Sequence, residues 1–231
     1  IEIARKVALV GGTEALKYFR SKNLSVENKS QTNFDPVTVA DRRAESVMRT
    51  EILKQFPKDS IIGEEYESII GSSGIKWFID PIDGARAFFS GTPSWGILVA
   101  VNDGVTPIIG VIYQPFTEEL FSGGLGNAFY EHKGKRKRIS SRECKSLSEA
   151  ILFSTFPEIG TDEEYKKFRV ISDVVKQTRY GFDCYAFALL AMGTIDIVME
   201  AGLHSYDIQA PQALIESSGG VVSSWVGKNP Q

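Results

Sequence analysis

Asp80 and Asp83 are the side chains in this sequence whose types and spacing are best suited to chemistry. They follow the apolar run Trp77-Phe78-Ile79, which predicts a buried strand. Pro81 lies between them and has no N–H to continue a ladder, so we expect the strand to end at Asp80. The turn would then let both carboxylates converge on one point. With the Ile82 carbonyl they offer the oxygen ligands that a hard cation such as Mg²⁺ prefers.

A glycine after the second aspartate indicates the start of a short helix. The backbone N–H groups of Gly84 and Ala85 would open that helix, and a helix N-terminus is a natural phosphate site. Cation and phosphate would then meet at one strand end. Phe88 and Phe89 in the same helix are expected in the core, whereas Trp95 fits either the core or a wall of the site.

Two further acidic positions lie at ends of predicted elements: Glu64 in Glu64-Glu65 follows the short strand predicted at Ser60–Gly63, and Asp207 precedes a predicted helix. Each position also has an ordinary interpretation. Glu65 alone fits a solvated surface charge, and both Asp207 and Asp41 fit helix N-caps. The aspartate pair is harder to explain in this way, because neighbouring carboxylates repel unless they are separated, capped or bound to cations. A two-metal phosphoryl-transfer site meets that requirement.

The composition is that of a globular domain with a slightly acidic balance. The chain has 231 residues, of which 42% are hydrophobic, and a net charge of −3. This length allows a sizeable core, and the charge gives no global sign of a nucleic-acid or membrane partner. No apolar run approaches the ~20 residues that span a bilayer. The two cysteines form no disulfide framework and favour a cytoplasmic location, and the two histidines argue against His-based nucleophilic catalysis.

Hydrophobic periodicity predicts the elements that would position these side chains. Residues 1–20 and a stretch from Asp41 to about Phe56 carry apolar residues at helical spacing. Strands at Gly96–Asn102 and Pro107–Tyr113 flank Asp103-Gly104, which is a strong hairpin signal.

The two parts of the chain follow different patterns. Residues 1–145 predict an α+β half with a mixed or antiparallel sheet, and residues 146–231 alternate strands and helices before a last strand at Val221–Ser223. We expect one domain with the active site in the groove between these halves. The basic run Lys133–Arg138 fits a solvated hairpin better than a nucleic-acid contact, because no aromatic residues interleave its charges.

The acidic motifs together resemble those of the inositol monophosphatase family. The matching segments are Gly63-Glu64-Glu65, Asp80-Pro81-Ile82-Asp83-Gly84, and Tyr206-Asp207-Ile208-Gln209-Ala210 with Glu216 and Gly219-Gly220. The resemblance extends from Val37-Thr38-Val39-Ala40-Asp41 to the last predicted strand. It implies an α/β (α+β) fold, the layered αβαβα sandwich of the inositol monophosphatase and fructose-1,6-bisphosphatase type. It also implies a Mg²⁺-dependent, Li⁺-sensitive phosphomonoesterase that acts on a small phosphorylated metabolite and forms a homodimer.

Family roles, carried over motif by motif, assign a complete site. The resemblance implies that the ligands of two or three Mg²⁺ ions are Glu64, Asp80, the Ile82 carbonyl, Asp83 and Asp207. Gly84 and Ala85 would bind phosphate through their N–H groups. Asp41 would lie beside the nucleophilic water and, with Glu64 and Asp83, would form the catalytic set. Metal-activated water would attack in line without a phosphoenzyme. This role replaces the capping interpretation of Asp41.

One position departs from the family pattern. The family usually carries Thr directly after Asp-Gly, where its hydroxyl links the attacking water to the acidic residue equivalent to Asp41. This chain has Ala85 there, which keeps the backbone N–H and lacks the hydroxyl. We therefore expect the Ala85→Thr variant to be faster than this chain.

Three segments resemble the branch that contains histidinol-phosphate phosphatases. They are Gly84-Ala85-Arg86-Ala87-Phe88, Gly91-Thr92-Pro93-Ser94-Trp95-Gly96 and Thr178-Arg179-Tyr180-Gly181-Phe182-Asp183-Cys184-Tyr185. By this similarity Asp183 and Glu200 lie near the alcohol part of the substrate, where acidic residues suit the amine and imidazole of histidinol. The ordinary interpretations are a helix N-cap for Asp183 and a surface charge at a strand end for Glu200.

Two alternatives to histidinol phosphate stay open at the level of the sequence. The first is inositol monophosphate, whose ring would need neutral and acidic hydrogen-bond partners. The second is a regulatory or binding protein built on a weakened phosphatase scaffold, which is suggested by Ala85 and the basic run. The complete set of carboxylate ligands favours an enzyme, because a binding module would gain nothing from a buried negative cluster.

Overall fold

The computed structural model describes the backbone of residues 1–21, 26–28 and 36–230, and the side chains of all these except 26–28 and 36–38. The helices in this part of the chain are α1 (Glu2–Leu16), α2 (Val39–Gln55), α3 (Ala85–Ser90), α4 (Asp162–Ser172), α5 (Asp183–Ala191) and α6 (Ser205–Ser217), with a short 3₁₀ turn at Leu147–Glu149. The strands are β1 (Val26–Asn28), β2 (Pro36–Thr38), β3 (Ser60–Gly63), β4 (Lys76–Asp83), β5 (Gly96–Asn102), β6 (Pro107–Gln114), β7 (Glu119–Gly124), β8 (Asn127–His132), β9 (Lys135–Ile139), β10 (Ile151–Ser154), β11 (Gln177–Tyr180) and β12 (Ile197–Val198).

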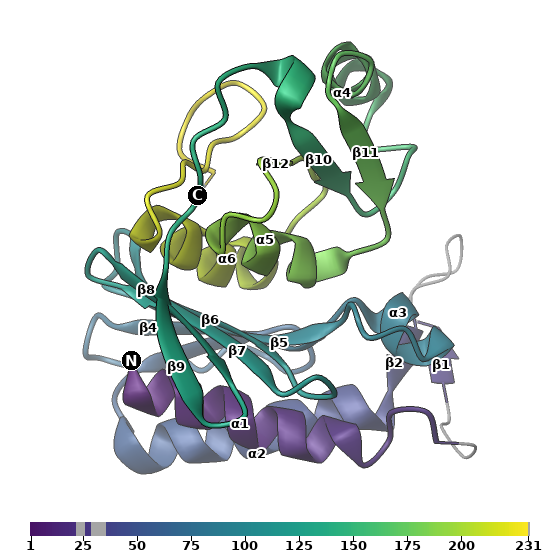
Figure 1. Ribbon diagram of the computed structural model, residues 1–231. Helices are drawn as coiled ribbons and strands as arrows, with labels where there is room; N and C mark the ends of the chain where they lie inside the picture. The colour runs from purple at the N-terminus through teal and green to yellow at the C-terminus, as the bar shows by residue number, and fades with distance from the viewer. Residues whose placement is uncertain (22–25, 29–35, 231) are drawn as a thin grey trace.

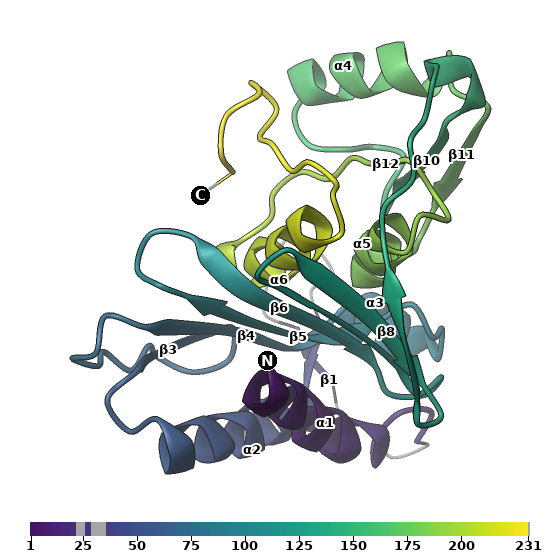
Figure 2. The same ribbon diagram turned by 60° about the vertical axis from the view of Figure 1, so that its left-hand side comes forward.

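Seven strands form the central sheet, in the order β3-β4-β5-β6-β7-β8-β9. β3 and β4 run parallel, and every other neighbouring pair is antiparallel, as hairpin connections require. α1 and α2 cover one face of this sheet, and α5 and α6 cover the other (Figure 1). The parallel sheet β11-β10-β12 lies beyond α5 and α6, and α4 lies outside it (Figure 2). The resulting layer order, αβαβα, confirms the expected fold class.

Two apolar cores hold the central layers together, one on each face of the sheet. Successive residues of β5 alternate between them, because side chains along a strand point to opposite faces. Ile97 and Val99 pack in the core under α1 and α2, whereas Leu98 packs in the core under α5 and α6. Both faces are covered, so β5 is buried along its whole length and is apolar except at Gly96 and Asn102.

α6 lies in backbone contact with the sheet, and this closeness depends on a glycine. A Cβ added at Gly110 of β6 would lie 2.1 Å from the carbonyl oxygen of Ala210 in α6. Any larger residue at position 110 would therefore push the helix outward. Because α5 and α6 come from residues 146–231 and pack on strands from residues 1–145, the two predicted halves share a core.

Helix starts differ from two sequence predictions. α2 begins at Val39 and α6 at Ser205, so Asp41 and Asp207 lie inside the first turn of their helices and are not N-caps. A carboxylate anywhere in the first turn is favoured by the helix dipole, so its presence does not locate the cap.

Strand predictions also need correction at two places. β4 continues through Pro81 to Asp83, so the strand does not end at Asp80. Val221–Ser223 forms no strand, and Val221 is 87% exposed, without the sheet partner that a β-branched side chain needs. The short helix α3 buries Phe88 as expected but leaves Phe89 half exposed.

The basic run forms an exposed hairpin between β8 and β9, as the sequence predicts. β9 is the edge strand of the central sheet, where charged residues discourage pairing with a second chain. No helix in the described part of the chain is both long enough and apolar enough to cross a membrane.

Candidate metal centre and active site

A bulge in β4 brings the two aspartates of the strand together. β4 pairs with β5 so that Asp80 faces Leu98 and Asp83 faces Gly96, which places one extra residue on β4. Pro81 fits this interruption because it has no N–H to offer to β5. The Ile82 N–H turns back and donates to Oδ1 of Asp80 at 2.9 Å. The bulge therefore re-aims side chains that a regular strand would send apart.

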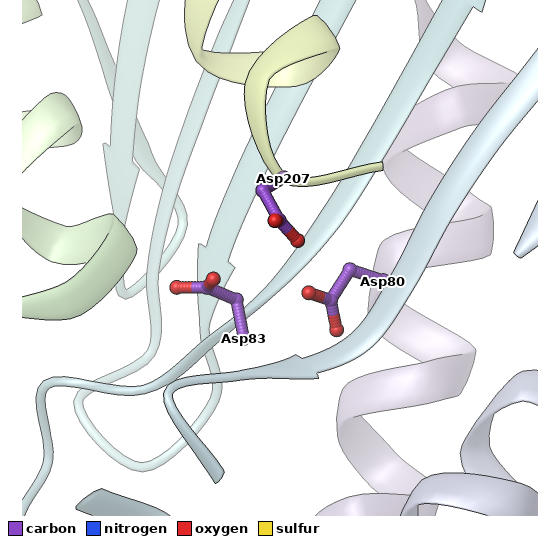
Figure 3. A group of neighbouring side chains, drawn as sticks. All are labelled: Asp80, Asp83 and Asp207. Atoms are coloured by element: carbon purple, nitrogen blue, oxygen red, sulfur yellow. The ribbon is translucent and has the colours of Figure 1, made fainter. Parts of the chain in front are cut away.

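A third carboxylate reaches the same point from α6. His204 is the N-cap of α6, and its N–H donates to Oδ2 of Asp207 at 2.7 Å within a capping box. Ligand atoms of Asp80, Asp83 and Asp207 all lie within 4.8 Å of one another. Figure 3 shows the three side chains facing one space, two from β4 and one from the start of α6. Their side-chain oxygens suit a hard divalent cation.

Burial and mutual repulsion dominate the electrostatics of this trio. Asp80 is 2% exposed, and desolvation raises its pKa well above the usual range, with further contributions from the charges of Glu64, Asp83 and Asp207. Desolvation likewise raises the pKa of Asp83, and it raises the pKa of Asp207 to about 6. Carboxylates in this state gain stability from a bound cation, which supplies the missing positive charge. The residues present therefore fit the metal that the sequence implies.

The remaining sequence-predicted ligands lie around the trio. Glu64 follows the end of β3 and lines the same cavity, and its charge raises the pKa values of Asp80 and Asp207. Ile82 lines the cavity as well. Asp41 lies in the first turn of α2 and is only 3% exposed, but it is not among the described residues that line the cavity.

The cavity has a volume of about 340 Å³ and extends from the trio past the start of α3 to the start of α5. Gly84 and Ala85 line it, and Gly84 has a φ of 84°, which favours glycine. A Cβ at Gly84 would also lie 2.9 Å from Cβ of Asp183. The predicted phosphate-binding residues and the predicted alcohol-binding residues thus border one space.

Asp183 occupies the first residue of α5 with a φ of 45°, a left-handed conformation that is strained for a residue with a side chain. The Ser94 hydroxyl donates to its Oδ2 at 2.8 Å, and burial raises its pKa. The next residue, Cys184, donates its N–H to Oδ2 of Asp83 at 2.7 Å. The start of α5 is therefore fastened directly to the metal-side end of β4. Phe182 is the N-cap of α5, so Asp183 does not have that role.

Glu200 lies after β12, and its carboxylate is held by Thr155. The N–H and the hydroxyl of Thr155 both donate to its Oε1, at 2.7 and 2.9 Å. Burial raises the pKa of Glu200 to about 7 despite these bonds, and the charge of Asp183 adds to the rise. Glu200 lines the cavity, so the interpretation as a surface charge is wrong.

Several cavity residues were not found from the sequence. Arg86, Thr155, Phe156 and His204 all line the space, and the Arg86 guanidinium lies 5.0 Å from the centre of the Phe156 ring. One signal could have found Thr155, because ligands of α/β folds gather at the carboxyl ends of parallel strands and Thr155 directly follows β10. Arg86 has no such signal, since exposed positions at a helix start carry charged residues for many reasons.

Comparisons with known proteins identify the family of this chain. The model of the inositol monophosphatase family matches residues 1–231. The chain is 38% identical over 228 residues to the bifunctional phosphatase IMPL2, chloroplastic, of Arabidopsis thaliana, covering 98% of this chain and 64% of that protein, which is less than two thirds of its length. It is 29% identical over 235 residues to a histidinol-phosphatase of Chlorobaculum parvum, covering 99% of this chain and 86% of that protein.

A solved structure gives the same result for the fold. An inositol monophosphatase from Zymomonas mobilis superposes with a TM-score of 0.83 at 31% identity, over 98% of this chain and 86% of that one. Relatives of both substrate names are therefore similar to this chain at comparable identity. On the match across its whole length, the chain belongs to the inositol monophosphatase family and is a phosphatase.

Proposed function

We propose that this protein is a Mg²⁺-dependent phosphomonoesterase whose substrate is a small cationic alcohol phosphate, histidinol phosphate. The single observation that carries the substrate proposal is the pair of carboxylates, Asp183 and Glu200, in the same cavity as the aspartate trio. Buried carboxylates next to an alcohol would stabilise an amine or imidazolium and would gain less from a neutral ring. The similarity to a histidinol-phosphatase supports the same choice.

The residues that would hold the metal are the trio Asp80, Asp83 and Asp207, with Glu64 and the Ile82 carbonyl. Bound Mg²⁺ would supply Lewis acidity, lowering the pKa of a coordinated water and stabilising charge on the leaving oxygen. The trio is already fixed by N–H bonds to Asp80, Asp83 and Asp207, so little rearrangement would be needed for the ligands to reach their positions.

The protein groups would divide the remaining work. The N–H groups of Gly84 and Ala85 would bind the phosphate oxygens at the start of α3. Glu64 would accept a proton from the attacking water, with Asp41 acting from the first turn of α2. Asp183 and Glu200 would orient the alcohol, so that the phosphate stays at the trio. A cavity of about 340 Å³ is large enough for such a molecule.

Inositol monophosphate is the second candidate, and the similarity to the Zymomonas mobilis enzyme favours it. Asp183 and Glu200 would then accept hydrogen bonds from ring hydroxyls. A regulatory protein is a third possibility, suggested by Ala85 and by the exposed basic hairpin of β8 and β9.

One experiment separates these three candidate functions. Phosphate release is measured side by side from histidinol phosphate and from inositol-1-phosphate, with and without Mg²⁺. We expect release that requires Mg²⁺ and a higher kcat/KM for histidinol phosphate. A preference for inositol-1-phosphate would contradict the substrate assignment. Release from neither ester by protein that binds Mg²⁺ would favour the regulatory function.

A further inference from the structure

A charged pair lies inside α2, away from the acidic cavity. Glu45 is 0% exposed and Arg49 is 8% exposed, and Nε of Arg49 donates to Oε1 of Glu45 at 2.7 Å, one helical turn apart. Moving two charges out of water costs free energy that the attraction between them does not reliably recover. A pair of apolar residues would serve a helix–sheet contact at least as well, so the pair needs a reason beyond stability.

The other bonds of this pair all go to one segment, the loop that begins with Glu64. The other carboxylate oxygen of Glu45, Oε2, accepts the N–H of Glu65 at 2.7 Å. The two terminal nitrogens of Arg49 donate to the carbonyls of Tyr66 and Glu67, each at 3.0 Å. The guanidinium fork and the carboxylate therefore hold three successive residues directly after Glu64.

The residue before Glu64 is Gly63, which has no side chain and so lets Glu45 approach the backbone closely. A Cβ added at Gly63 would lie 2.2 Å from Oε1 of Glu45, so the carboxylate rests on the backbone at that point. The bonds thus begin immediately after Glu64 and the close contact lies immediately before it. Asp41 lies one turn before Glu45 on the same face of α2, so the face that carries the pair also carries a predicted catalytic residue.

We propose that Glu45 and Arg49 are positioning residues that fix the backbone on both sides of Glu64, and thereby set the metal affinity of the site. The proposal rests on the metal-dependent function above, in which Glu64 is a ligand. The pair itself reaches neither metal nor substrate and acts only through the loop. Partners bonded directly to metal ligands change metal affinity by roughly 10–100-fold when they are lost, and this pair, which bonds the backbone beside the ligand, is expected at the low end of that range.

Arg49→Lys is the most informative variant. It keeps the charge that neutralises Glu45, but a single ammonium cannot reach Glu45 and two carbonyls in the geometry of the fork. We expect Mg²⁺ and Mn²⁺ to bind about tenfold more weakly in calorimetric titration without substrate. We also expect faster hydrogen exchange at the amides of residues 65–67 in metal-free protein, with unchanged exchange in β5 and β6.

Two further variants separate positioning from general stability. Glu45→Leu/Arg49→Met replaces the pair by apolar groups and so leaves no buried charge unpaired, but it removes the bonds to residues 65–67, so metal binding should weaken at least as much as in Arg49→Lys. Arg142→Lys is the matched control. Arg142 also binds a carboxylate through two nitrogens, and that carboxylate, Asp196, also accepts a backbone N–H, from Ile151. Metal affinity should not change in this control.

The possible outcomes distinguish this proposal from the function on which it rests. Wild-type protein that binds no divalent cation would contradict the metal-dependent function. Wild-type binding together with wild-type affinity in Arg49→Lys would overturn the positioning role alone. Equal weakening in Arg142→Lys would also overturn it, because the effect would then reflect loss of any arginine–carboxylate pair and not this one. If the double variant does not fold, Arg49→Lys and its control still decide.

Discussion

The two ends of the cavity hold their carboxylates differently. At the metal end, formed by Asp80, Asp83 and Asp207, backbone N–H groups bind the carboxylates. At the hydroxyl-held end, formed by Asp183 and Glu200, side-chain hydroxyls also bind them. Asp80, Asp83 and Asp207 each accept an N–H group, from Ile82, Cys184 and His204 respectively. Asp183 instead accepts the hydroxyl of Ser94, and Glu200 accepts both the N–H and the hydroxyl of Thr155.

The difference indicates which contacts of this site a single substitution can change. Every residue except proline has a backbone N–H, so the end of the cavity at Asp80, Asp83 and Asp207 is determined by the bulge in β4 and by the starts of α5 and α6. A hydroxyl partner can be removed by one substitution without disturbing the fold. We infer that the metal end sets the reaction and that the hydroxyl-held end is where the substrate can be changed.

The strongest test of this comparison is Asp83→Asn. The amide keeps the size of the side chain but loses the charge, so the trio no longer suits a divalent cation. We expect kcat to fall by roughly 10³-fold or more for every substrate, as it does when charge stabilisation in a transition state is lost. Phosphate release at saturating Mg²⁺ measures this. Asp173→Asn at the C-cap of the outer helix α4 is the control, and persistent activity in Asp83→Asn would refute the metal assignment.

The sequence predicted the members of the metal end better than their geometry. The motif around Asp80 and Asp83 indicated a pair of ligands, yet it suggested that the strand stops at Pro81. The structure shows a bulge instead, because a missing N–H interrupts a ladder without ending it. Likewise, Asp207 was expected either as a ligand or as a cap, and a local pattern could not show that His204 takes the capping position.

The hydroxyl-held end could not be predicted in the same way. Ser94 lies far from Asp183 in the sequence, and Thr155 lies far from Glu200. Hydrophobic periodicity assigns residues to elements but does not say which distant residues meet. The contact between Ser94 and Asp183 arises only when α5 is placed on the central sheet, and the contact between Thr155 and Glu200 only when β10 pairs with β12. Resemblance to a family suggested the two carboxylates and not the hydroxyls that hold them.

The pH dependence of KM tests the alcohol end, with a smaller expected effect. The pKa of Glu200 is raised to about 7 by burial, so the group is neutral below that pH and charged above it. For cationic histidinol phosphate, KM should therefore fall about tenfold as pH rises from 6 to 8. Glu200→Gln should remove this part of the pH dependence, leaving that of the phosphate and imidazole groups of the substrate. An identical pH profile in the variant would contradict the role of Glu200.

Thr155→Val sharpens the same comparison by removing only the hydroxyl. The hydrogen bonds from Thr155 lower the pKa of Glu200, so losing one should raise it further. The midpoint of the KM profile should then move to higher pH, by about one unit for a bond to a charged group. Thr155→Ser should restore the original midpoint. A midpoint that does not move in Thr155→Val would show that the hydroxyl does not tune this end.

Ala85→Thr has the smallest expected effect. It tests whether the attacking water needs a side-chain hydroxyl at position 85. Ala85 lines the cavity at the start of α3, and its N–H is unaffected by the substitution. By resemblance to the family, a hydroxyl there would link the attacking water to Asp41, which lies in the first turn of α2 and is not among the described residues that line the cavity. We expect kcat to rise by roughly threefold to tenfold, less than full general-base catalysis contributes. Ala85→Val, which matches the shape of threonine without the hydroxyl, is the control. If kcat in Ala85→Thr is unchanged or lower, the backbone-held carboxylates already orient the water, and the metal end works without a side-chain hydroxyl.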